Sequence, residues 1–262
     1  MIDFLSVQNQ RIEVEWHRGL SGKPTLVFLH EGLGCVSLWK DFPSILSQMT
    51  QCNAFVFSRL GHGRSDPCRL PRKINFMHGE ALHFLPAVLA AAGILDHIII
   101  GHSDGGSMGI IYAGSLRANR LKGLITEAAH VFCEPLTQEA IRTAKHHYLQ
   151  HDLKKRLERY HGPNTENTFW GWNTVWLHPR FIHWNIQKYL KQIKVPALAL
   201  QGLQDQYGSP TQLTAMTSGI KHCEAHLIDH CRHTPHQDQR EKVLASMARF
   251  IRNCLPGDHL SS

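Results

Sequence analysis

The sequence lacks the features that mark membrane-spanning or secreted proteins. It contains no run of about 18 uncharged apolar residues, so no transmembrane helix is expected. Residues 1–7 lack the basic start and apolar middle of a secretory signal and alternate like a strand instead. From the sequence we therefore expect a cytoplasmic protein.

The chain also lacks a regular cysteine spacing and has a low fraction of charged residues. Its seven cysteines are irregularly spaced with no C-x-x-C pair, which argues against a disulfide framework, a zinc ribbon or a thioredoxin-like site. Only 19 % of the residues are charged, and the formal net charge of +7 fits either a basic soluble enzyme or an acidic partner or substrate. Because no nucleic-acid motif accompanies this charge, nucleic-acid binding is not expected.

Short apolar segments alternate with segments of helical periodicity. A half-buried strand is predicted near residues 12–16, and further strands at 24–30, 53–58, 96–101, 121–126, 195–201 and 223–229. Helices are predicted at 38–49, 76–92, 107–116 and 235–253. This alternation predicts an α/β fold with a mostly parallel sheet flanked by helices.

Residues 131–192 interrupt the alternation. They are rich in charged and aromatic side chains, contain no convincing core strand, and carry apolar residues at roughly helical spacing between 141 and 160. We interpret this segment as a helical cap, inserted into a core domain made of residues 1–130 and 193–262.

Ser103 lies in the segment 101–106, between a predicted strand and a predicted helix. The segment follows the pattern G-x-S-x-G, in which small neighbours let a nucleophile sit on a sharp strand-to-helix turn. The pattern alone is a weak signal, and its alternative is a serine–aspartate pair that caps the helix. The strand–turn–helix context favours Ser103 as a nucleophile that faces the N-terminus of a helix.

A serine nucleophile needs a histidine base that a carboxylate orients, and in this arrangement the chain order is serine, acid, histidine. Asp205 follows the predicted strand 195–201, and His233 lies in the loop before the last predicted helix. His236 is an alternative base, but it should fall in the first turn of that helix. Asp229 is an alternative acid, but it is too close to the histidine in sequence to reach across from another strand.

The chain has 20 histidines, so a lone histidine carries little information. The densest group runs from residue 222 to residue 236, yet four residues of strand span roughly 13 Å, too far for neighbours to share one metal ion. Neither a metal nor a cofactor is expected.

An oxyanion hole needs two backbone N–H donors. Asp104, directly after Ser103, should supply one, and the segment 30–34 after an early predicted strand should supply the other. Aligned without a gap, the second donor is Gly32; with a one-residue insertion it is Leu33, which we favour.

Together these motifs resemble the α/β-hydrolase superfamily over nearly the whole chain. SRLGHGRSD at 58–66 looks like its G-x-G-x-S loop, and HTPHQDQ at 233–239 looks like its histidine segment. Glu31 stands where its oxyanion motif commonly has glycine, which leaves the second donor open. The chain is also similar to a bacterial subgroup of small serine hydrolases with HEGLG, GHSDGG, a Trp-rich cap and a QDQYG-type acid loop. The resemblance implies an α/β-hydrolase fold of about eight strands and a Ser–His–Asp triad, but little about substrate.

The predicted function is hydrolysis of a carboxylic ester or thioester through an acyl-enzyme intermediate. Specificity should lie in the cap, where the predicted substrate contacts are His130, Glu134, Trp170, Trp172 and Trp176. For the tryptophans, packing of the cap onto the core is an equal alternative.

Three other functions stay open at this point. The basic run 154–156 with Arg159 is typical of a solvated helix face, but it could hold an acidic acyl carrier protein or coenzyme A, which would make the protein a hydrolase of carrier-bound methyl esters or thioesters. The same triad also serves hydrolases of carbon–carbon bonds in ring-cleavage diketo acids. A non-catalytic binding protein on the same fold is the third alternative.

Overall fold

Eight strands form one sheet in the computed structural model, which describes residues 2–255. They are β1 (Ile2–Val7), β2 (Gln10–His17), β3 (Thr25–Leu29), β4 (Ala54–Phe57), β5 (His97–His102), β6 (Leu121–Glu127), β7 (Ala197–Gly202) and β8 (Cys223–Ile228). Their order in the sheet is β1-β2-β4-β3-β5-β6-β7-β8. β1 and β2 pair antiparallel, as do β2 and β4, and all other pairs are parallel. The predicted mostly parallel sheet is confirmed.

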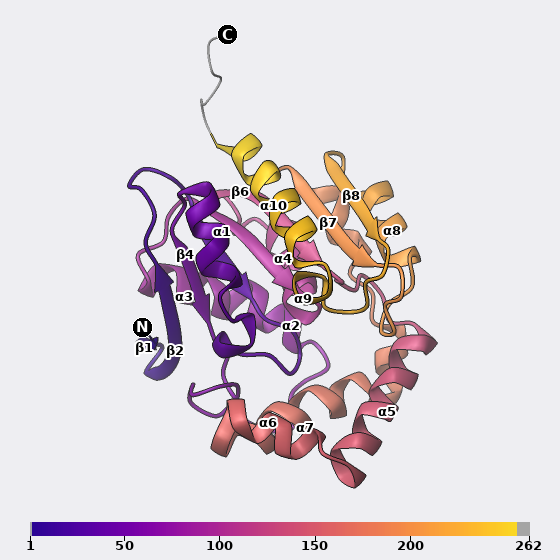
Figure 1. Ribbon diagram of the computed structural model, residues 1–262. Coiled ribbons are helices and arrows are strands. Elements are labelled where there is room, and N and C mark those ends of the chain that lie inside the picture. Colours follow the sequence, from indigo (N-terminus) through magenta and orange to yellow (C-terminus); the bar gives the residue numbers. More distant parts are fainter. Residues whose placement is uncertain (1, 256–262) are drawn as a thin grey trace.

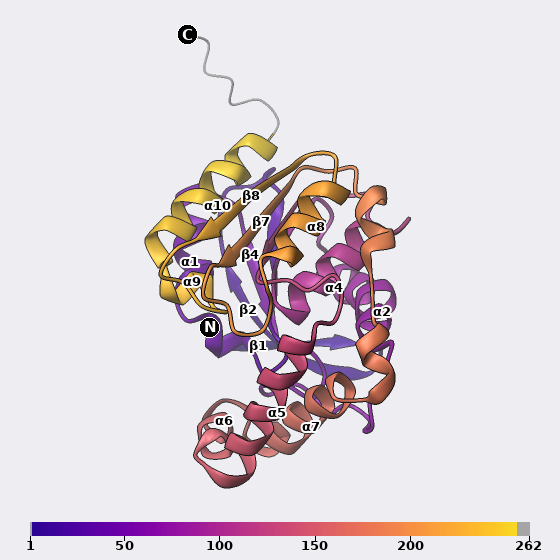
Figure 2. The ribbon, with the colours of Figure 1, turned by 90° about the vertical axis from the view of Figure 1, so that its right-hand side faces the viewer.

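Helices cover both faces of the sheet, as Figure 2 shows edge-on. On one face lie α1 (Phe42–Thr50), α9 (Pro235–Asp238) and α10 (Arg240–Cys254); on the other lie α2 (Phe76–Gly79), α3 (Leu85–Ala91), α4 (Asp104–Ala113) and α8 (Thr211–Gly219). Along β3, Leu26 and Phe28 pack into one apolar cluster, and Val27 and Leu29 pack into the other. Burial on both faces explains why these strands are continuous apolar runs rather than alternating ones.

Two predicted helices are broken in the structure. The segment 76–92 contains α2, a π-helical stretch η2 (Glu80–Phe84) and α3. Pro86 has no N–H to donate to the preceding turn, which favours this local rearrangement. The last predicted helix is divided at Gln239, whose φ of −134° and ψ of 49° are not helical, into α9 and α10.

A helical insertion lies between β6 and β7. It consists of α5 (Pro135–Gln150), α6 (Leu153–His161) and α7 (Thr165–Trp176), with the short helices η3 (Gly162–Asn164), η4 (Pro179–His183) and η5 (Gln187–Gln192). Figure 1 shows α5, α6 and α7 together beyond one end of the sheet. η5 instead packs against α4 and α8, so the chain rejoins the core before residue 192. Among residues 2–255, no helix is long and apolar enough to cross a bilayer.

Candidate active site

Ser103 occupies a strained turn between β5 and α4. Its φ of 53° and ψ of −116° lie outside the regions that a residue with a side chain normally adopts. The glycines of the motif are needed sterically, because a Cβ on Gly105 would collide with the carbonyl of Leu29, and a Cβ on Gly101 would collide with the carbonyl of Gly105. The close approach of strand and helix therefore explains the spacing of the G-x-S-x-G pattern.

The side chain of Ser103 meets His233 and Asp205, which come from the loops after β8 and β7. His233 Nε2 lies 2.9 Å from Ser103 Oγ, and His233 Nδ1 lies 2.8 and 3.0 Å from the two carboxylate oxygens of Asp205. A carboxylate accepts, so Nδ1 carries the proton and Nε2 is free to accept from the serine hydroxyl. The structure thus brings together the three residues that the sequence predicts to act together.

Asp205 is held as an ion inside its loop. Its Oδ1 also accepts hydrogen bonds from the amides of Tyr207 at 2.8 Å and Gly208 at 3.3 Å. Burial would raise the pKa of this carboxyl, but the charge and hydrogen bond of His233 and the Tyr207 amide hold the pKa below its usual range. The carboxylate can therefore orient His233 and stabilise a positive charge on it.

The two alternative residues lie elsewhere. His236 is buried in α9, and its Nδ1 lies 2.7 Å from a carboxylate oxygen of Glu127. Asp229 is exposed and accepts a hydrogen bond from Gln204 at 3.2 Å. Neither takes the position that His233 or Asp205 occupies beside Ser103.

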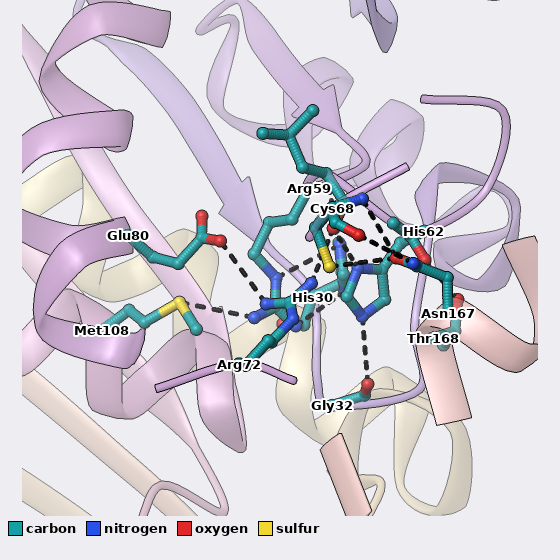
Figure 3. A network of polar contacts seen from close by, with 12 residues as sticks. His30, Gly32, Arg59, His62, Cys68, Arg72, Glu80, Met108, Asn167 and Thr168 are labelled. Carbon is teal, nitrogen blue, oxygen red and sulfur yellow. Dashed lines mark hydrogen bonds and ion pairs between the residues drawn. The ribbon is translucent and has the colours of Figure 1, made fainter. Parts of the chain in front are cut away.

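The segment 30–34 is held through its carbonyl groups by buried side chains. Arg59 Nη2 donates to the carbonyl of Glu31 at 2.7 Å, and Arg59 is only 2 % exposed. His62 Nε2 lies 3.1 Å from the carbonyl of Gly32, as Figure 3 shows. Arg59 and His62 belong to the segment that resembles the G-x-G-x-S loop, but the sequence does not indicate which backbone carbonyls their side chains contact.

A third anchor of this segment comes from the helical insertion. His161, at the end of α6, accepts a hydrogen bond from the amide of Gly63 at 2.9 Å, so its proton is on Nε2. That Nε2 donates to the carbonyl of Leu33 at 2.9 Å. No motif singles out His161, which is one of many histidines. In a trans peptide the N–H points away from the C=O of the preceding residue, so the amides of Gly32 and Leu33 point away from Arg59 and His62, which hold the carbonyls of Glu31 and Gly32. The Leu33 carbonyl shares its peptide with the Gly34 amide, so His161 fixes the far end of the segment.

A cavity of about 180 Å³ lies over Ser103. It is lined by Glu31, Gly32, Leu33, His102, Ser103, Asp104, His130, Thr137, Ile141, Trp172, Trp176, Gln206, Tyr207, His233 and Thr234. The lining thus includes both candidate oxyanion segments and three of the five predicted substrate contacts. Within the described chain, it contains two carboxylates and neither lysine nor arginine.

Glu134 and Trp170, the other two predicted contacts, are not among the residues that line this cavity. Glu134 accepts hydrogen bonds from the amide and hydroxyl of Ser209 at 3.0 and 2.6 Å, and so ties the start of α5 to the loop after Asp205. Trp170 donates to Glu166 on its own helix at 2.6 Å. The reason is helical geometry: Trp172 and Trp176 are four residues apart and share a face of α7, whereas Trp170 lies on another face.

The ionisable groups around the cavity have shifted pKa values. Burial would raise the pKa of Glu31, but the neighbouring His102 lowers it to about 2, so Glu31 is an anion. Burial raises the pKa of Asp104 to about 6, although its Oδ1 accepts from Trp176 Nε1 at 3.1 Å. Burial and the nearby charge of His233 lower the pKa of His130 to about 4. Burial would lower the pKa of His102, which also lines the cavity, but the neighbouring Glu31 carboxylate raises it. At neutral pH the cavity wall thus holds the Glu31 carboxylate paired with His102 and the uncharged imidazole of His130.

The basic run on α6 is partly neutralised by its own surroundings. Lys154 Nζ lies 2.6 Å from a carboxylate oxygen of Glu166, and Arg156 Nε lies 3.3 Å from one of Asp152. Both pairs are exposed, so each contributes little to stability, but each leaves less positive charge for an acidic partner.

Residues 26–246 match the model of the alpha/beta hydrolase family, and the chain belongs to this family. No curated protein sequence matches it. The structure is similar to MGS-M2, an alpha/beta hydrolase enzyme from a Medee basin deep-sea metagenome library, at 18 % identity over 98 % of this chain and 100 % of that one, with a TM-score of 0.76.

Two further similar structures differ in their described activity. One is a meta-cleavage product hydrolase from Pseudomonas fluorescens IP01, at 15 % identity over 97 % of this chain and 98 % of that one, with a TM-score of 0.76. The other is a thermophilic esterase from Thermogutta terrifontis, at 17 % identity over 97 % and 99 %, with a TM-score of 0.74. At such identities the likeness shows the fold alone, and the activity has to be argued from the site.

Proposed function

We propose that the protein is a serine hydrolase that cleaves an uncharged carboxylic ester or thioester by two-step acyl transfer. The observation that carries the proposal is the connected chain Ser103–His233–Asp205, with hydrogen-bond distances of 2.9 and 2.8 Å. A hydroxyl, an imidazole and a carboxylate in this order are the groups that acyl transfer to serine requires.

In the first step His233 Nε2 accepts the Ser103 proton while Ser103 Oγ attacks the carbonyl carbon. The tetrahedral intermediate collapses as the bond to the leaving group breaks, and His233 donates its proton to the departing oxygen or sulfur. In the second step His233 deprotonates a water, which attacks the acyl-enzyme and releases the acid and free Ser103. Asp205 keeps Nδ1 protonated throughout and stabilises the imidazolium.

The oxyanion is proposed to face the amide of Asp104, at the N-terminus of α4, and an amide of Gly32 or Leu33. Support comes from the carbonyls of Glu31 and Gly32, which share peptides with the amides of Gly32 and Leu33 and are engaged by the buried side chains of Arg59 and His62. Since the amides point the other way and both Gly32 and Leu33 line the cavity, either can face an oxyanion. Each such donor is typically worth roughly 2.7–4 kcal/mol of barrier.

The lining of the cavity favours an ester over a ring-cleavage diketo acid. A diketo acid is anionic, and it would meet the ionised Glu31 in a lining that has no lysine or arginine and whose His102 is already paired with Glu31. The cavity volume of about 180 Å³ also fits a small group around the scissile bond. Because Lys154 and Arg156 pair with nearby carboxylates, docking of an acidic acyl carrier receives no support.

Labelling with a fluorophosphonate and turnover of p-nitrophenyl acetate test the proposal. The wild-type protein should be labelled and should hydrolyse the ester, and Ser103→Ala should lose labelling and at least about 10³-fold of kcat. Ser115→Ala, which changes a serine just after the same helix, should keep both. Preferred turnover of an anionic diketo acid would favour the carbon–carbon hydrolase. Absence of labelling and of turnover on both substrates would favour a binding protein.

A further inference from the structure

His130 has a buried polar side chain that the protein itself does not satisfy. The residue is only 2 % exposed, and its Nδ1 is sealed from solvent without a partner in residues 2–255. The hydrogen bonds of His130 in the described chain are those of its main chain, where the amide and carbonyl both contact Ser107 Oγ, at 3.1 and 2.7 Å. The backbone is therefore fixed, while the imidazole has no partner, which is rare for a buried ring.

The ring of His130 faces the cavity over Ser103. It lines that cavity, with its centroid 5.2 Å from the Trp176 ring in an edge-on arrangement and 5.9 Å from the His233 ring. The main chain at His130 follows β6, and the two contacts to Ser107 tie it to α4. A substrate carbonyl beside Ser103 would thus have an imidazole within reach of its neighbouring atoms.

The position of the single proton on this ring follows from burial. The pKa of His130 is lowered to about 4 by burial and by His233, so the ring is neutral near pH 7 and carries one N–H. A proton on the sealed Nδ1 would be a donor without an acceptor, which costs more than a lone pair without a donor. The proton therefore belongs on Nε2, the nitrogen left to face a ligand.

We propose that the Nε2–H of His130 donates a hydrogen bond to a second, uncharged oxygen of the substrate, close to the scissile carbonyl. The inference rests on the proposed ester hydrolysis and names its substrate class: esters with a hydroxyl, ether or carbonyl oxygen near the ester group. An uncharged oxygen is specified because the ionised Glu31 lies in the same lining, where the imidazole of His102 is already paired with it. His130 is then a specificity-determining residue.

The test compares esters that differ only by one oxygen in place of one methylene. In the acyl arm, p-nitrophenyl methoxyacetate is compared with p-nitrophenyl butyrate; in the alcohol arm, 2-methoxyethyl acetate is compared with butyl acetate. For each pair the ratio of kcat/KM is measured in the wild-type protein and in His130→Phe, which keeps an aromatic ring against Trp176. The two esters differ in intrinsic reactivity, but this difference is the same for both enzymes and cancels when the wild-type and variant ratios are compared.

We expect the preference for the oxygenated ester to fall about tenfold in His130→Phe in one arm, equivalent to about 1.4 kcal/mol. The other arm should not change, which locates the oxygen on the acyl or the alcohol side. His130→Gln, which retains an N–H donor, should recover part of the preference. His151→Phe, the same substitution at an exposed histidine after α5, should leave both ratios unchanged.

The failures of the two proposals are distinguishable. Ratios that are equal in the wild-type protein, His130→Phe and His130→Gln in both arms, with active enzyme throughout, would overturn the role of His130 and leave ester hydrolysis intact. A wild-type protein that hydrolyses none of the four esters and takes up no fluorophosphonate at Ser103 would overturn both. Loss of all turnover in His130→Gln with intact labelling of Ser103 would also overturn the inference, since it would indicate a role for His130 in the chemistry itself.

Discussion

The two sides of Ser103 are built differently. On the proposed acid–base side, Asp205 and His233 lie in the loops after β7 and β8, two neighbouring parallel strands, and contact each other directly. On the proposed oxyanion side, the segment 30–34 is held by Arg59 after β4 and by His161 in the insertion, both far away along the chain. One side follows from the order of the strands, and the other follows from contacts between distant segments.

The comparison shows why the two sides differ in how they can fail. Asp205 acts on His233 through one direct contact, so a single substitution there should remove most of its effect. The carbonyls of Glu31, Gly32 and Leu33 have separate anchors, so the loss of one leaves the others in place. A single substitution on the acid–base side should therefore cause a large loss of kcat, whereas a single substitution among the anchors of segment 30–34 should cause only a partial loss.

The largest effect is expected for Asp205→Asn. An asparagine no longer stabilises an imidazolium at His233 and can donate to Nδ1, which favours the wrong tautomer, so kcat should fall about 10⁴-fold with little change in KM. Steady-state kinetics with p-nitrophenyl acetate measure this. Asp229→Asn, at the exposed alternative acid, is the matched control and should stay near wild type. Equal losses in the two variants would contradict the assignment of the acid.

The acid–base side could be predicted from the sequence, because strand order and loop position depend on local apolar runs and turns. Ser103, Asp205 and His233 each follow such a run. The strands were predictable for the same reason. The division of the last predicted helix at Gln239 into α9 and α10 was not. In contrast, the roles of Arg59 and His161 depend on which carbonyl each side chain meets after folding, and no spacing in the sequence encodes that.

The insertion shows the same limit. Its aromatic residues indicated a cap over the site, but choosing among Trp170, Trp172 and Trp176 required knowing where α7 begins and which face it turns to the cavity. Glu134 was predicted as a pocket residue from its place after β6, yet its carboxylate pairs with Ser209 and Gln212. A side chain's position along the chain is easier to predict than its direction.

A smaller, graded effect is expected for His161→Phe. The variant loses the donor to the Leu33 carbonyl and the acceptor for the Gly63 amide, and we expect kcat to fall about tenfold with KM nearly unchanged, less than for loss of an oxyanion donor itself. His161→Gln, which retains an N–H donor, should recover part of kcat, and His151→Phe is the control for an exposed histidine.

Affinity for a boronic-acid transition-state analogue separates positioning from packing at His161. If the contact to Leu33 positions the oxyanion amides, the inhibition constant for the analogue should rise in parallel with the loss in kcat/KM. A raised KM with unchanged kcat and unchanged analogue affinity would instead mean that His161 only packs the insertion onto the core.

The smallest effect on activity is expected for Asp104→Asn, which keeps the backbone amide proposed for the oxyanion. Its effect should appear in stability. Burial raises the pKa of Asp104 from an ordinary 3.8 to about 6, so the folded state binds its proton more tightly than the unfolded state. The stabilisation from this proton is complete below about pH 4 and is lost as the pH rises through 6. At higher pH the carboxyl is ionised in both states, and the charge is less favourable in the buried site than in the unfolded chain.

Asp104→Asn should therefore stabilise the protein at pH 8 but not at pH 4. The asparagine carbonyl can still accept from Trp176 Nε1, and a difference of about two pKa units corresponds to roughly 3 kcal/mol at the higher pH. Urea unfolding at the two pH values measures the difference, and kcat at pH 8 should change less than about threefold, since the amide is unaltered. An equal shift in stability at both pH values would show that folding does not raise the pKa of this carboxyl. A large loss of kcat would show that its charge, and not only its amide, acts on the oxyanion side.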